Sequence, residues 1–350
     1  MKNFCLFLYL ISFMAACDSK TTSENQAKQQ SGDVTLVIHG GAGTIRKENM
    51  SPEKEAAYHA AMKQALNVGY AILDEGGTSV DAVIAAIKVM EDSPLFNAGR
   101  GAVFTNEGKN ELDASIMDGR TLMAGAVAGV TNVKNPITAA HAVMTKSQHV
   151  MLTGRGAEQF AEEQGLEIVD PSYFFDSTRY KHLLRLQEKE KNSGGLSVVQ
   201  LSEDPFVKGS KFGTVGAVAL DKSGNIAAGT STGGMTNKRY GRVGDAPIIG
   251  AGTYANNATC GISATGWGEY FIRLSVAHDI AAMMEYAHLS IDEAADSVIM
   301  KKLTTLGGDG GVVGLDQQGN ITMKFNSDGM YRGYIKERGA AKTFIYKDDP

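Results

Sequence analysis

The sequence is poor in cysteine, proline and long hydrophobic runs, and it has no excess of basic residues. Only 3 of its 350 residues are Cys and only 7 are Pro. With so few Cys, neither a disulfide framework nor a sulfur-ligated metal site can be built. The net charge of −5 gives no support to nucleic-acid binding, which requires a basic face. The hydrophobic content of 43% excludes a disordered chain and is enough for a large core.

The first 33 residues have the pattern of an export signal followed by a tether. Residues 4–16 are almost wholly apolar and follow one basic residue, which predicts a signal peptide over residues 1–16. This apolar run of 13 residues is too short to span a bilayer. Cys17 follows two small residues, as in a bacterial lipobox, so we expect lipidation of its thiol. Residues 17–33 form a polar tether. The expected location is the periplasm or cell envelope of a bacterium, with a lipid anchor as the sole membrane contact.

Glycine, in contrast, is abundant. The sequence has 41 Gly, whereas average usage would give about 25. An excess of this kind is needed where the backbone adopts positive φ or closely approaches another group. The Gly-rich segments are therefore the first places in which to expect a functional site.

The first part of the chain predicts helices mixed with strands. A β-branched run predicts a strand, and apolar residues at helical spacing behind cap-like Ser51 and Thr78 predict two helices. Farther on, a charged and then Gly-containing stretch predicts a flexible linker. The expected elements are a strand at 34–38, helices at 52–73 and 80–90, short strands within 97–118, a strand at 122–132 and the linker at 180–213.

The second part predicts two similar hairpins separated by helices. Each hairpin has an apolar run, a five-residue turn that begins with Asp and ends with Gly-Asn, and a returning strand. Ser290 and Glu293 form a capping box at the start of the second helix. Two such hairpins indicate two layers of antiparallel sheet in an α+β protein. The expected hairpins are 214–220 with 226–230 and 312–315 with 321–325, and the first helix is 269–286.

Several common catalytic motifs are absent or lack their structural context. Arg46 stands where a dinucleotide-binding loop needs its third Gly, and no phosphate-binding loop motif or H-x-x-x-H pair occurs. Gly229–Gly233 matches the serine-hydrolase motif G-x-S-x-G, but the residues that follow it do not predict the helix that this motif requires. Most of the seven histidines are interpreted as ordinary surface or core residues.

Thr214 is a candidate N-terminal nucleophile, because it starts a predicted strand directly after the linker and Gly213. Cleavage between Gly213 and Thr214 would place an α-amine beside the hydroxyl, and an amine with a pKa near 8 can accept its proton. Gly213 would permit the strained backbone that self-cleavage needs. The alternative is that Thr214 is only a β-branched residue that opens a strand, and spacing alone does not exclude it.

Long motifs along the chain resemble the plant-type asparaginase / isoaspartyl peptidase family of Ntn-hydrolases. The resemblance covers about residues 34–348. Its motifs are His39–Gly43, Pro94–Gly99, Gly213–Asp221, Ser231–Lys238, Gly241–Pro247, Gly250–Asn257, Leu306–Gly311 and Phe325–Asn326. It implies a four-layer αββα sandwich that cleaves itself into an α-chain, 34–213, and a β-chain, 214–350, within one domain.

The resemblance also implies roles for individual residues. Thr214 would be the nucleophile and Thr232 would activate it, while Arg242 and Asp245 would hold the α-carboxylate and α-ammonium of an aspartyl substrate. Thr265 and Gly266 would form the oxyanion hole, and Asn97 would support that region or the cleavage step. Further implications are a sodium ion held by backbone carbonyls of the loop Met90–Arg100, no other cofactor, and a dimer of αβ units.

Two positions decide between branches of the family. Gly213 precedes the nucleophile where glycosylasparaginases typically have Asp, which favours the plant-type branch. Trp267 follows Gly266 where a smaller residue is expected, so it would line the leaving-group side of the pocket. The expected function is hydrolysis of L-asparagine, β-aspartyl dipeptides or both. A glycosylasparaginase and a non-catalytic solute-binding lipoprotein remain the alternatives.

Overall fold

The computed structural model describes residues 33–192 and 213–349. The predicted signal peptide, Cys17 and almost all of the tether lie outside the described residues, as do residues 193–212 of the predicted linker. No helix among the described residues has the length and apolar character needed to cross a bilayer.

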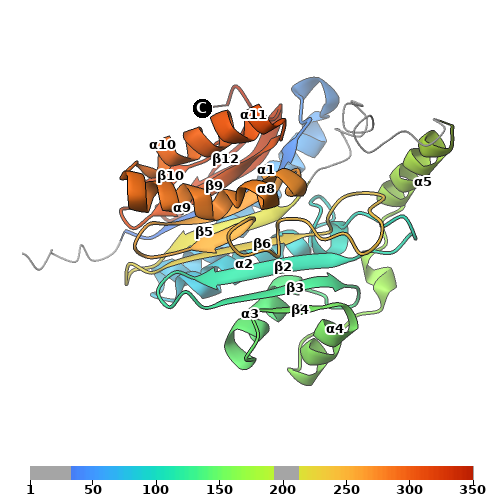
Figure 1. The fold of residues 1–350 in the computed structure, drawn as a ribbon, viewed down its shortest axis with the longest axis horizontal. Coiled ribbons are helices and arrows are strands. Elements are labelled where there is room, and N and C mark those ends of the chain that lie inside the picture. The colour runs from blue at the N-terminus through green and yellow to red at the C-terminus, as the bar shows by residue number, and fades with distance from the viewer. Residues whose placement is uncertain (1–32, 193–212, 350) are drawn as a thin grey trace, which may run out of the picture. The chain divides into compact units, whose positions relative to one another are not determined.

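A large sheet of eight strands forms one central layer (Figure 1). Its strand order is β12-β11-β1-β5-β6-β2-β3-β4, and only β3 and β4 pair in parallel among its neighbours. Strands β5 and β6, which are the first predicted hairpin, therefore lie near its middle. The strands are β1 (Thr35–Gly43), β2 (Leu112–Asp118), β3 (Ala124–Val130), β4 (Met151–Thr153), β5 (Val215–Leu220), β6 (Ile226–Thr232), β11 (Gly329–Ile335) and β12 (Lys342–Tyr346).

A smaller sheet of four strands faces the large one, in the order β10-β9-β8-β7. The second predicted hairpin, β9 with β10, belongs to this sheet, so the two hairpins lie in different layers as predicted. The strands are β7 (Thr253–Ala255), β8 (Cys260–Gly266), β9 (Gly310–Asp316) and β10 (Ile321–Thr322).

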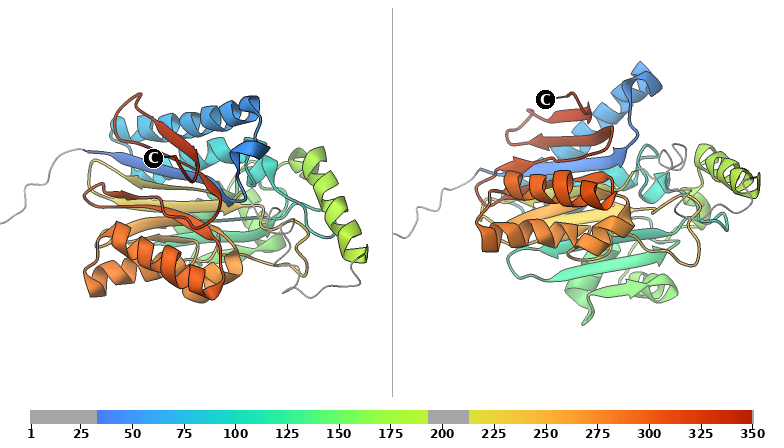
Figure 2. Two further views of the ribbon diagram at one scale, coloured as in Figure 1. Left: turned by 90° about the horizontal axis from the view of Figure 1, so that it is seen from above. Right: turned by 45° about the horizontal axis from the view of Figure 1, so that its top comes forward.

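Helices cover the outer face of each sheet, as the left view of Figure 2 shows. Those on the large sheet are α1 (Pro52–Asp74), α2 (Ser79–Glu91) and α3 (Pro136–Lys146), and those on the small sheet are α8 (Gly268–Leu274), α9 (Val276–Ala287) and α10 (Ile291–Ala295). The remaining helices are α4 (Gly154–Glu163), α5 (Ser177–Asn192), α11 (Thr304–Leu306), the π-helix Asp296–Leu303 and the 3-10 helices Lys47–Asn49, Gly99–Gly101 and Pro171–Phe174.

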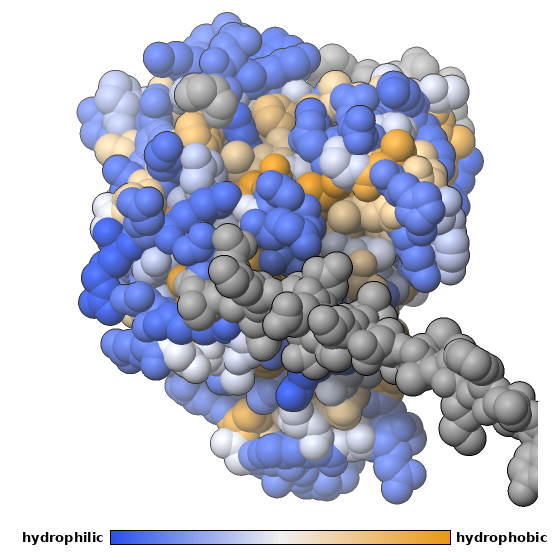
Figure 3. Space-filling view, turned by 90° about the vertical axis from the view of Figure 1, so that its left-hand side faces the viewer, coloured by the Kyte–Doolittle hydropathy of each residue, from blue (hydrophilic) through white to orange (hydrophobic). Residues whose placement is uncertain are grey.

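Three buried apolar layers hold these four layers of secondary structure together. One lies under α1, α2 and α3 and one under α8, α9 and α10. The third, which includes Val37, Val218 and Val313, lies between the sheets. This arrangement confirms the predicted αββα sandwich. Where side chains reach the surface in Figure 3, hydrophilic residues cover most of the face shown.

The local signals at helix starts were read correctly. The Ser51 and Thr78 side chains accept hydrogen bonds from the third residues of α1 and α2, and Ser290 and Glu293 form the reciprocal capping box of α10. Gly76 follows α1 at φ +88°, a conformation that favours glycine.

Four predicted elements were wrong in type or extent. Residues 180–192 form most of α5 and are not a flexible linker, because Leu183 and Leu186 give the charged segment a buried face. Residues 97–111 contain no strand, and β2 begins only at Leu112. The predicted helix 269–286 is broken at Ser275, whose φ of +48° lies in the left-handed region. Strand β10 has only two residues, although Phe325 makes an isolated bridge to Gly311.

Candidate active site

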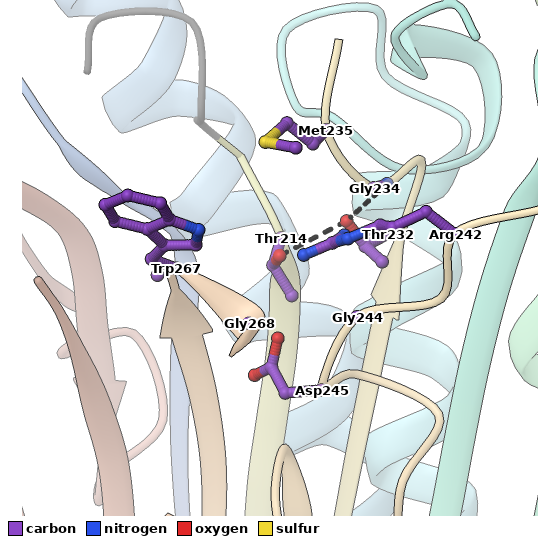
Figure 4. A pocket seen from close by; sticks show the side chains of 10 residues that line it. Thr214, Thr232, Gly234, Met235, Arg242, Gly244, Asp245, Trp267 and Gly268 are labelled. Carbon is purple, nitrogen blue, oxygen red and sulfur yellow. Dashed lines mark hydrogen bonds between the residues drawn. The ribbon is translucent and has the colours of Figure 1, made fainter. Parts of the chain in front are cut away.

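A pocket opens at the end of the hairpin where β5 begins and β6 ends (Figure 4). Three segments far apart in the chain meet there: the start of β5, the loop after β6, and the junction of β8 with α8. Ten residues line the pocket: Thr214, Thr232, Gly234, Met235, Arg242, Gly244, Asp245, Gly266, Trp267 and Gly268.

Two threonine hydroxyls meet on one wall of the pocket. Thr214 directly precedes β5, and Thr232 is the last residue of β6. The hydroxyl of Thr214 donates to the hydroxyl oxygen of Thr232 at 3.2 Å, and that oxygen also accepts from the backbone N–H of Gly234 at 3.0 Å. Thr232 is thus held as an acceptor for the proton of Thr214, which is the polarity that a nucleophilic hydroxyl requires.

The same hairpin excludes a serine-hydrolase elbow. The G-x-S-x-G residues belong to β6 and its immediate end, and irregular backbone follows through residue 252. The Ser231 hydroxyl donates to the buried carboxylate of Glu91 at 2.6 Å, so it faces away from the pocket residues. The motif therefore lacks the helix that its chemistry needs.

The peptide bond before Thr214 is held by closely approaching backbone. The carbonyl oxygen of Gly213 accepts from the backbone N–H of Asn97 at 2.9 Å, and Gly213 has a φ of +117°. A Cβ atom on Gly41 would stand 2.6 Å from the Cα atom of Gly213. Asn97 also donates from its side chain to the carbonyl of Gly234 at 2.7 Å. It thus connects this peptide bond to the pocket loop.

Arg242 is held by an acidic partner that the sequence interpretation missed. Its Nε and Nη2 atoms donate to the two carboxylate oxygens of Glu269, each at 2.9 Å. Glu269 is the second residue of α8, beyond Trp267 and Gly268. This bidentate pair fixes the plane of the guanidinium group, which points toward Thr214 in Figure 4. No spacing in the sequence predicts a pair 27 residues apart.

Asp245 is a buried carboxylate with unused hydrogen-bonding capacity. It is 5% exposed, and burial raises its pKa to about 7, against the opposing effect of Arg242. Its Oδ2 atom has no hydrogen-bond partner among the described residues. Figure 4 shows the carboxylate pointing toward Thr214. A buried, unpaired acceptor beside the pocket suits a ligand that carries an ammonium group.

Thr265 and Gly266 end β8 beside the nucleophile candidate. Gly266 lines the pocket at φ +149°, and a Cβ atom there would come within 2.6 Å of Gly310 Cα. Thr265 is 1% exposed and its hydroxyl accepts from the backbone N–H of Ala42 at 3.3 Å. The pair thus lies where the glycine-rich end of β1 meets the pocket.

Trp267 forms the wall on the other side of Thr214 from Arg242, with Met235 above both in Figure 4. The indole ring meets Tyr270 edge to face with ring centroids 4.9 Å apart. The pocket therefore has a charged side, formed by Arg242 and Asp245, and an apolar side, formed by Trp267 and Met235.

His39 was given no role from the sequence, but it contacts the nucleophile candidate. Its Nδ1 atom lies 3.0 Å from the carbonyl oxygen of Thr214, and its Nε2 atom lies 2.8 Å from the hydroxyl of Ser263. The ring is fully buried, which lowers its pKa to about 3, so it is neutral at physiological pH. Its place in the glycine-rich strand end was the signal that could have identified it.

The loop Met90–Arg100 carries carbonyl oxygens that converge on glycines. Cβ atoms on Gly99 and Gly101 would collide with the carbonyl oxygens of Glu91 and Phe96. Carbonyl oxygens of this kind are hard ligands. The Glu91 side chain is buried as well, and burial raises its pKa to about 8. No cluster of three His, Cys, Asp or Glu side chains suited to a metal occurs in the described part of the chain.

The structure thus gathers most of the predicted site in one place. Thr214, Thr232, Arg242, Asp245 and Gly266 line the pocket. Asn97 lies behind it and contacts Gly213, and Thr265 adjoins it on β8, whereas Cys17 lies outside the described residues.

Comparison with known proteins agrees with this geometry. The family described as Asparaginase matches residues 32–345. The chain is 49% identical over 317 residues to the isoaspartyl peptidase of Escherichia coli (strain K12), covering 91% of this chain and 97% of that protein. It is 51% identical over 322 residues to a putative isoaspartyl peptidase/L-asparaginase of Dictyostelium discoideum, covering 86% and 92%. It is 43% identical over 312 residues to the plant-type L-asparaginase of Pyrococcus furiosus, covering 87% and 97%.

Proposed function

This chain belongs to the asparaginase family and is a hydrolase, and from that premise we propose that it cleaves L-asparagine and β-aspartyl dipeptides with Thr214 as the nucleophile. The observation that carries the proposal is the hydrogen bond from the Thr214 hydroxyl to Thr232 in a pocket with a guanidinium and a buried carboxylate. A hydroxyl can attack the amide carbonyl carbon, and a cation and an anion can bind the α-carboxylate and α-ammonium of an aspartyl substrate.

The charged side of the pocket binds the aspartyl part of the substrate. Arg242 keeps its guanidinium plane through Glu269 and pairs with the α-carboxylate. Asp245, with a free Oδ2 atom, accepts from the α-ammonium group. These two contacts place the side-chain carbonyl carbon of the substrate beside the Thr214 hydroxyl.

The reaction proceeds through an ester. The Thr214 oxygen attacks the side-chain carbonyl carbon, its proton passes to the α-amine freed by chain cleavage, and the negative charge forms near Thr265 and Gly266. The C–N bond then breaks, and the leaving ammonia or amino acid takes the proton. Water hydrolyses the ester and releases aspartate. Trp267 and Met235 face the departing group, since the charged residues occupy the other side.

The α-amine comes from self-cleavage between Gly213 and Thr214. The Thr214 hydroxyl attacks the carbonyl carbon of Gly213, the C–N bond breaks as an ester forms, and water hydrolyses that ester. The backbone N–H of Asn97 already donates to the Gly213 carbonyl oxygen at 2.9 Å, so it stabilises the charge on that oxygen. The cleavage would divide the domain into an α-chain part, 34–213, and a β-chain part, 214–350.

A sodium ion would suit the loop Met90–Arg100. Backbone carbonyls around Gly99 and Gly101 would hold it, and the loop also carries Asn97. When bound, the ion would stiffen this loop and so steady the Asn97 N–H beside Gly213.

Export, lipidation and assembly are further parts of the proposal. The apolar segment 4–16 and the small residues before Cys17 support a signal peptide and a lipid anchor in a bacterial envelope. The assembly expected from the family resemblance is a dimer of two-chain units.

Intact mass under denaturing conditions tests the mechanism first. We expect protein lacking residues 1–20, after incubation at neutral pH, to give two masses that sum to the precursor plus one water. The smaller fragment should begin at Thr214. The processed protein should release aspartate from L-asparagine or β-aspartyl dipeptides and not from GlcNAc-asparagine. A single uncut chain without turnover would contradict the assignment of Thr214 as the nucleophile. Cleavage with turnover of GlcNAc-asparagine alone would contradict only the proposed substrate.

A further inference from the structure

A chain of buried hydroxyl groups crosses the apolar layer between the two sheets and ends on the nucleophile residue. Starting from His39, the successive hydrogen-bonded groups are Ser263, Thr230, Thr253 and Ser115, at 2.8, 2.7, 2.6 and 2.8 Å. All five side chains are 0% exposed. They alternate between the sheets, on β1, β8, β6, β7 and β2. Buried polar groups in an apolar layer are costly unless every member is satisfied, so this chain calls for an explanation.

The direction of the protons in this chain is fixed by its end at Thr214. A carbonyl oxygen only accepts, so His39 must donate to it from Nδ1. The neutral ring then has Nε2 as an acceptor, and Ser263 must donate to it. Because a hydroxyl has one proton, the Ser263 oxygen can then only accept at its 2.7 Å contact with Thr230. The Thr230 proton has two acceptors within reach, the Ser263 oxygen and the carbonyl oxygen of Gly252 at 3.0 Å, and Thr253 donates to Thr230. The bonds from Ser263 and His39 therefore both point toward the carbonyl of Thr214, and aligned bonds strengthen one another.

The backbone around Thr214 explains why a side chain is needed there. The pairing of β5 with β1 ends at Gly216 opposite His39, because the register of β1 shifts between His39 and Gly41. The pairing of β5 with β6 ends at Val215. Thr214 thus lies just past the end of both ladders, and the His39 imidazole replaces the missing ladder bond to its carbonyl.

Gly216 provides the space that this series of hydrogen-bonded side chains needs. A Cβ atom at this position would overlap both the Ser263 hydroxyl and the Nε2 atom of His39. Its φ lies outside the left-handed range, so the backbone conformation does not explain a glycine here. The absence of a side chain on β5 leaves the space in which His39 of one sheet meets Ser263 of the other.

We propose that His39 is a positioning residue, held in its Nδ1-protonated form by Ser263, that fixes the Thr214 backbone so that the nucleophile's hydroxyl stays aimed at Thr232. The inference concerns orientation and does not depend on which amide the pocket binds.

The first test reads the proton positions directly. In the processed protein with ¹⁵N-labelled histidine, the His39 signal, assigned by its loss in His39→Asn, should be that of a neutral ring protonated at Nδ1. A ring protonated at Nε2, or at both nitrogens, would overturn the proposal, whatever the activity of the enzyme.

The second test separates positioning from general stability. Ser263→Ala removes the donor to Nε2, and we expect kcat to fall about tenfold with KM changed less than twofold. The control Thr322→Val also removes a buried hydroxyl from the small sheet, one bonded to Asp292, and should leave kcat unchanged.

His39→Asn, whose amide N–H can replace Nδ1–H, should retain more kcat than His39→Leu. Equal kcat in wild type and Ser263→Ala, or equal losses in the two His39 variants, would overturn the proposal. Should Ser263→Ala not cleave itself, its labelled precursor should show His39 partly protonated at Nε2, and a ring still protonated only at Nδ1 would overturn the role of Ser263.

Discussion

The two hairpins of the sandwich have nearly the same turn and entirely different open ends. In the turn of β5–β6, the Asp221 carboxylate accepts from the backbone N–H groups of Ser223 and Asn225 at 2.9 and 3.0 Å. In the turn of β9–β10, Asp316 accepts from Gln318 and Asn320, both at 2.9 Å. Gly224 and Gly319 have matching φ values of +77° and +73°.

The open ends of the two hairpins differ. The first hairpin opens on Thr214 and Thr232, with a pocket beyond them, whereas the second begins at Gly310 beside the end of β8. The conformation of each turn is specified by one short segment of the sequence. The open end combines Thr214 and Thr232 of the hairpin itself with residues that other elements bring to them. Breaking the open end should therefore abolish function, and breaking the turn should affect stability alone.

The largest effect is expected for Thr214→Ala. It removes the hydroxyl that we propose as the nucleophile, so both self-cleavage and turnover should fall below detection, while the melting temperature of the precursor stays close to that of the wild type. Intact mass and aspartate release measure the outcome. Thr214→Ser retains a hydroxyl and should still be cleaved. A cleaved or active Thr214→Ala protein would contradict the role of the open end.

An intermediate effect is expected at Asp245, in the loop beyond the first hairpin. Only its charged form can hold an ammonium group, so KM should fall as the pH rises through about 7, the pKa to which burial raises this carboxyl. Asp245→Asn removes a charge-assisted contact and should lower kcat/KM about 10–100-fold. It should also abolish this pH dependence of KM.

Asp245→Asn should increase the stability of the folded protein at high pH, although it lowers kcat/KM. Because the folded pKa of Asp245 is raised, its contribution favours the folded state below the unfolded pKa and is lost as the pH rises through about 7. Asp245→Asn should therefore melt at a higher temperature than the wild type at pH 8, by a smaller margin at pH 5, and at a similar temperature only below the ordinary carboxyl pKa of 3.8. A variant that is less stable at pH 8 would show that Asp245 has a structural role instead.

The same contrast between local and assembled features separates what the sequence predicted from what it did not. Caps such as Ser51 and Ser290 and the two hairpin turns depend on neighbours within a few residues, and they were predicted correctly. Thr214 was a candidate because it starts a strand directly after Gly213, and the family resemblance supplied the role of Thr232. His39 and Ser263 are 224 residues apart and Arg242 and Glu269 are 27 apart, so only the fold reveals their contacts.

Helix α5 shows the opposite kind of error. Its charged sequence was interpreted as a linker because few apolar residues appear in it. Besides the buried face of Leu183 and Leu186, distant partners hold it: Gln187 donates to the carbonyl of Asn106, and Glu190 accepts from Asn237 and Arg239 in the loop beyond β6. A local pattern could not predict these contacts.

The smallest effect, and the sharpest test of the comparison, is expected at the two turn aspartates. Asp221→Ala and Asp316→Ala each remove an acceptor for two backbone N–H groups, which should cost about 1 kcal/mol of unfolding free energy. Asp221 should cost more, about 2 kcal/mol, since its second oxygen accepts from the backbone N–H of Ser79 at the start of α2 at 3.1 Å, whereas the second oxygen of Asp316 accepts from the side-chain amide of Asn320 within its own turn at 2.9 Å. Urea unfolding measures both values.

The kinetic side of this last prediction is that neither turn variant changes kcat by more than twofold, because the turn lies at the far end of β5 from Thr214. Asp221→Asn and Asp316→Asn keep the Oδ1 acceptor and serve as matched controls that should recover most of the lost stability. A large loss of kcat in Asp221→Ala but not in Asp316→Ala would mean that the two ends of β5 are coupled. Strand β5, which His39 and Ser263 approach closely at Gly216, would then be the element that transmits the coupling.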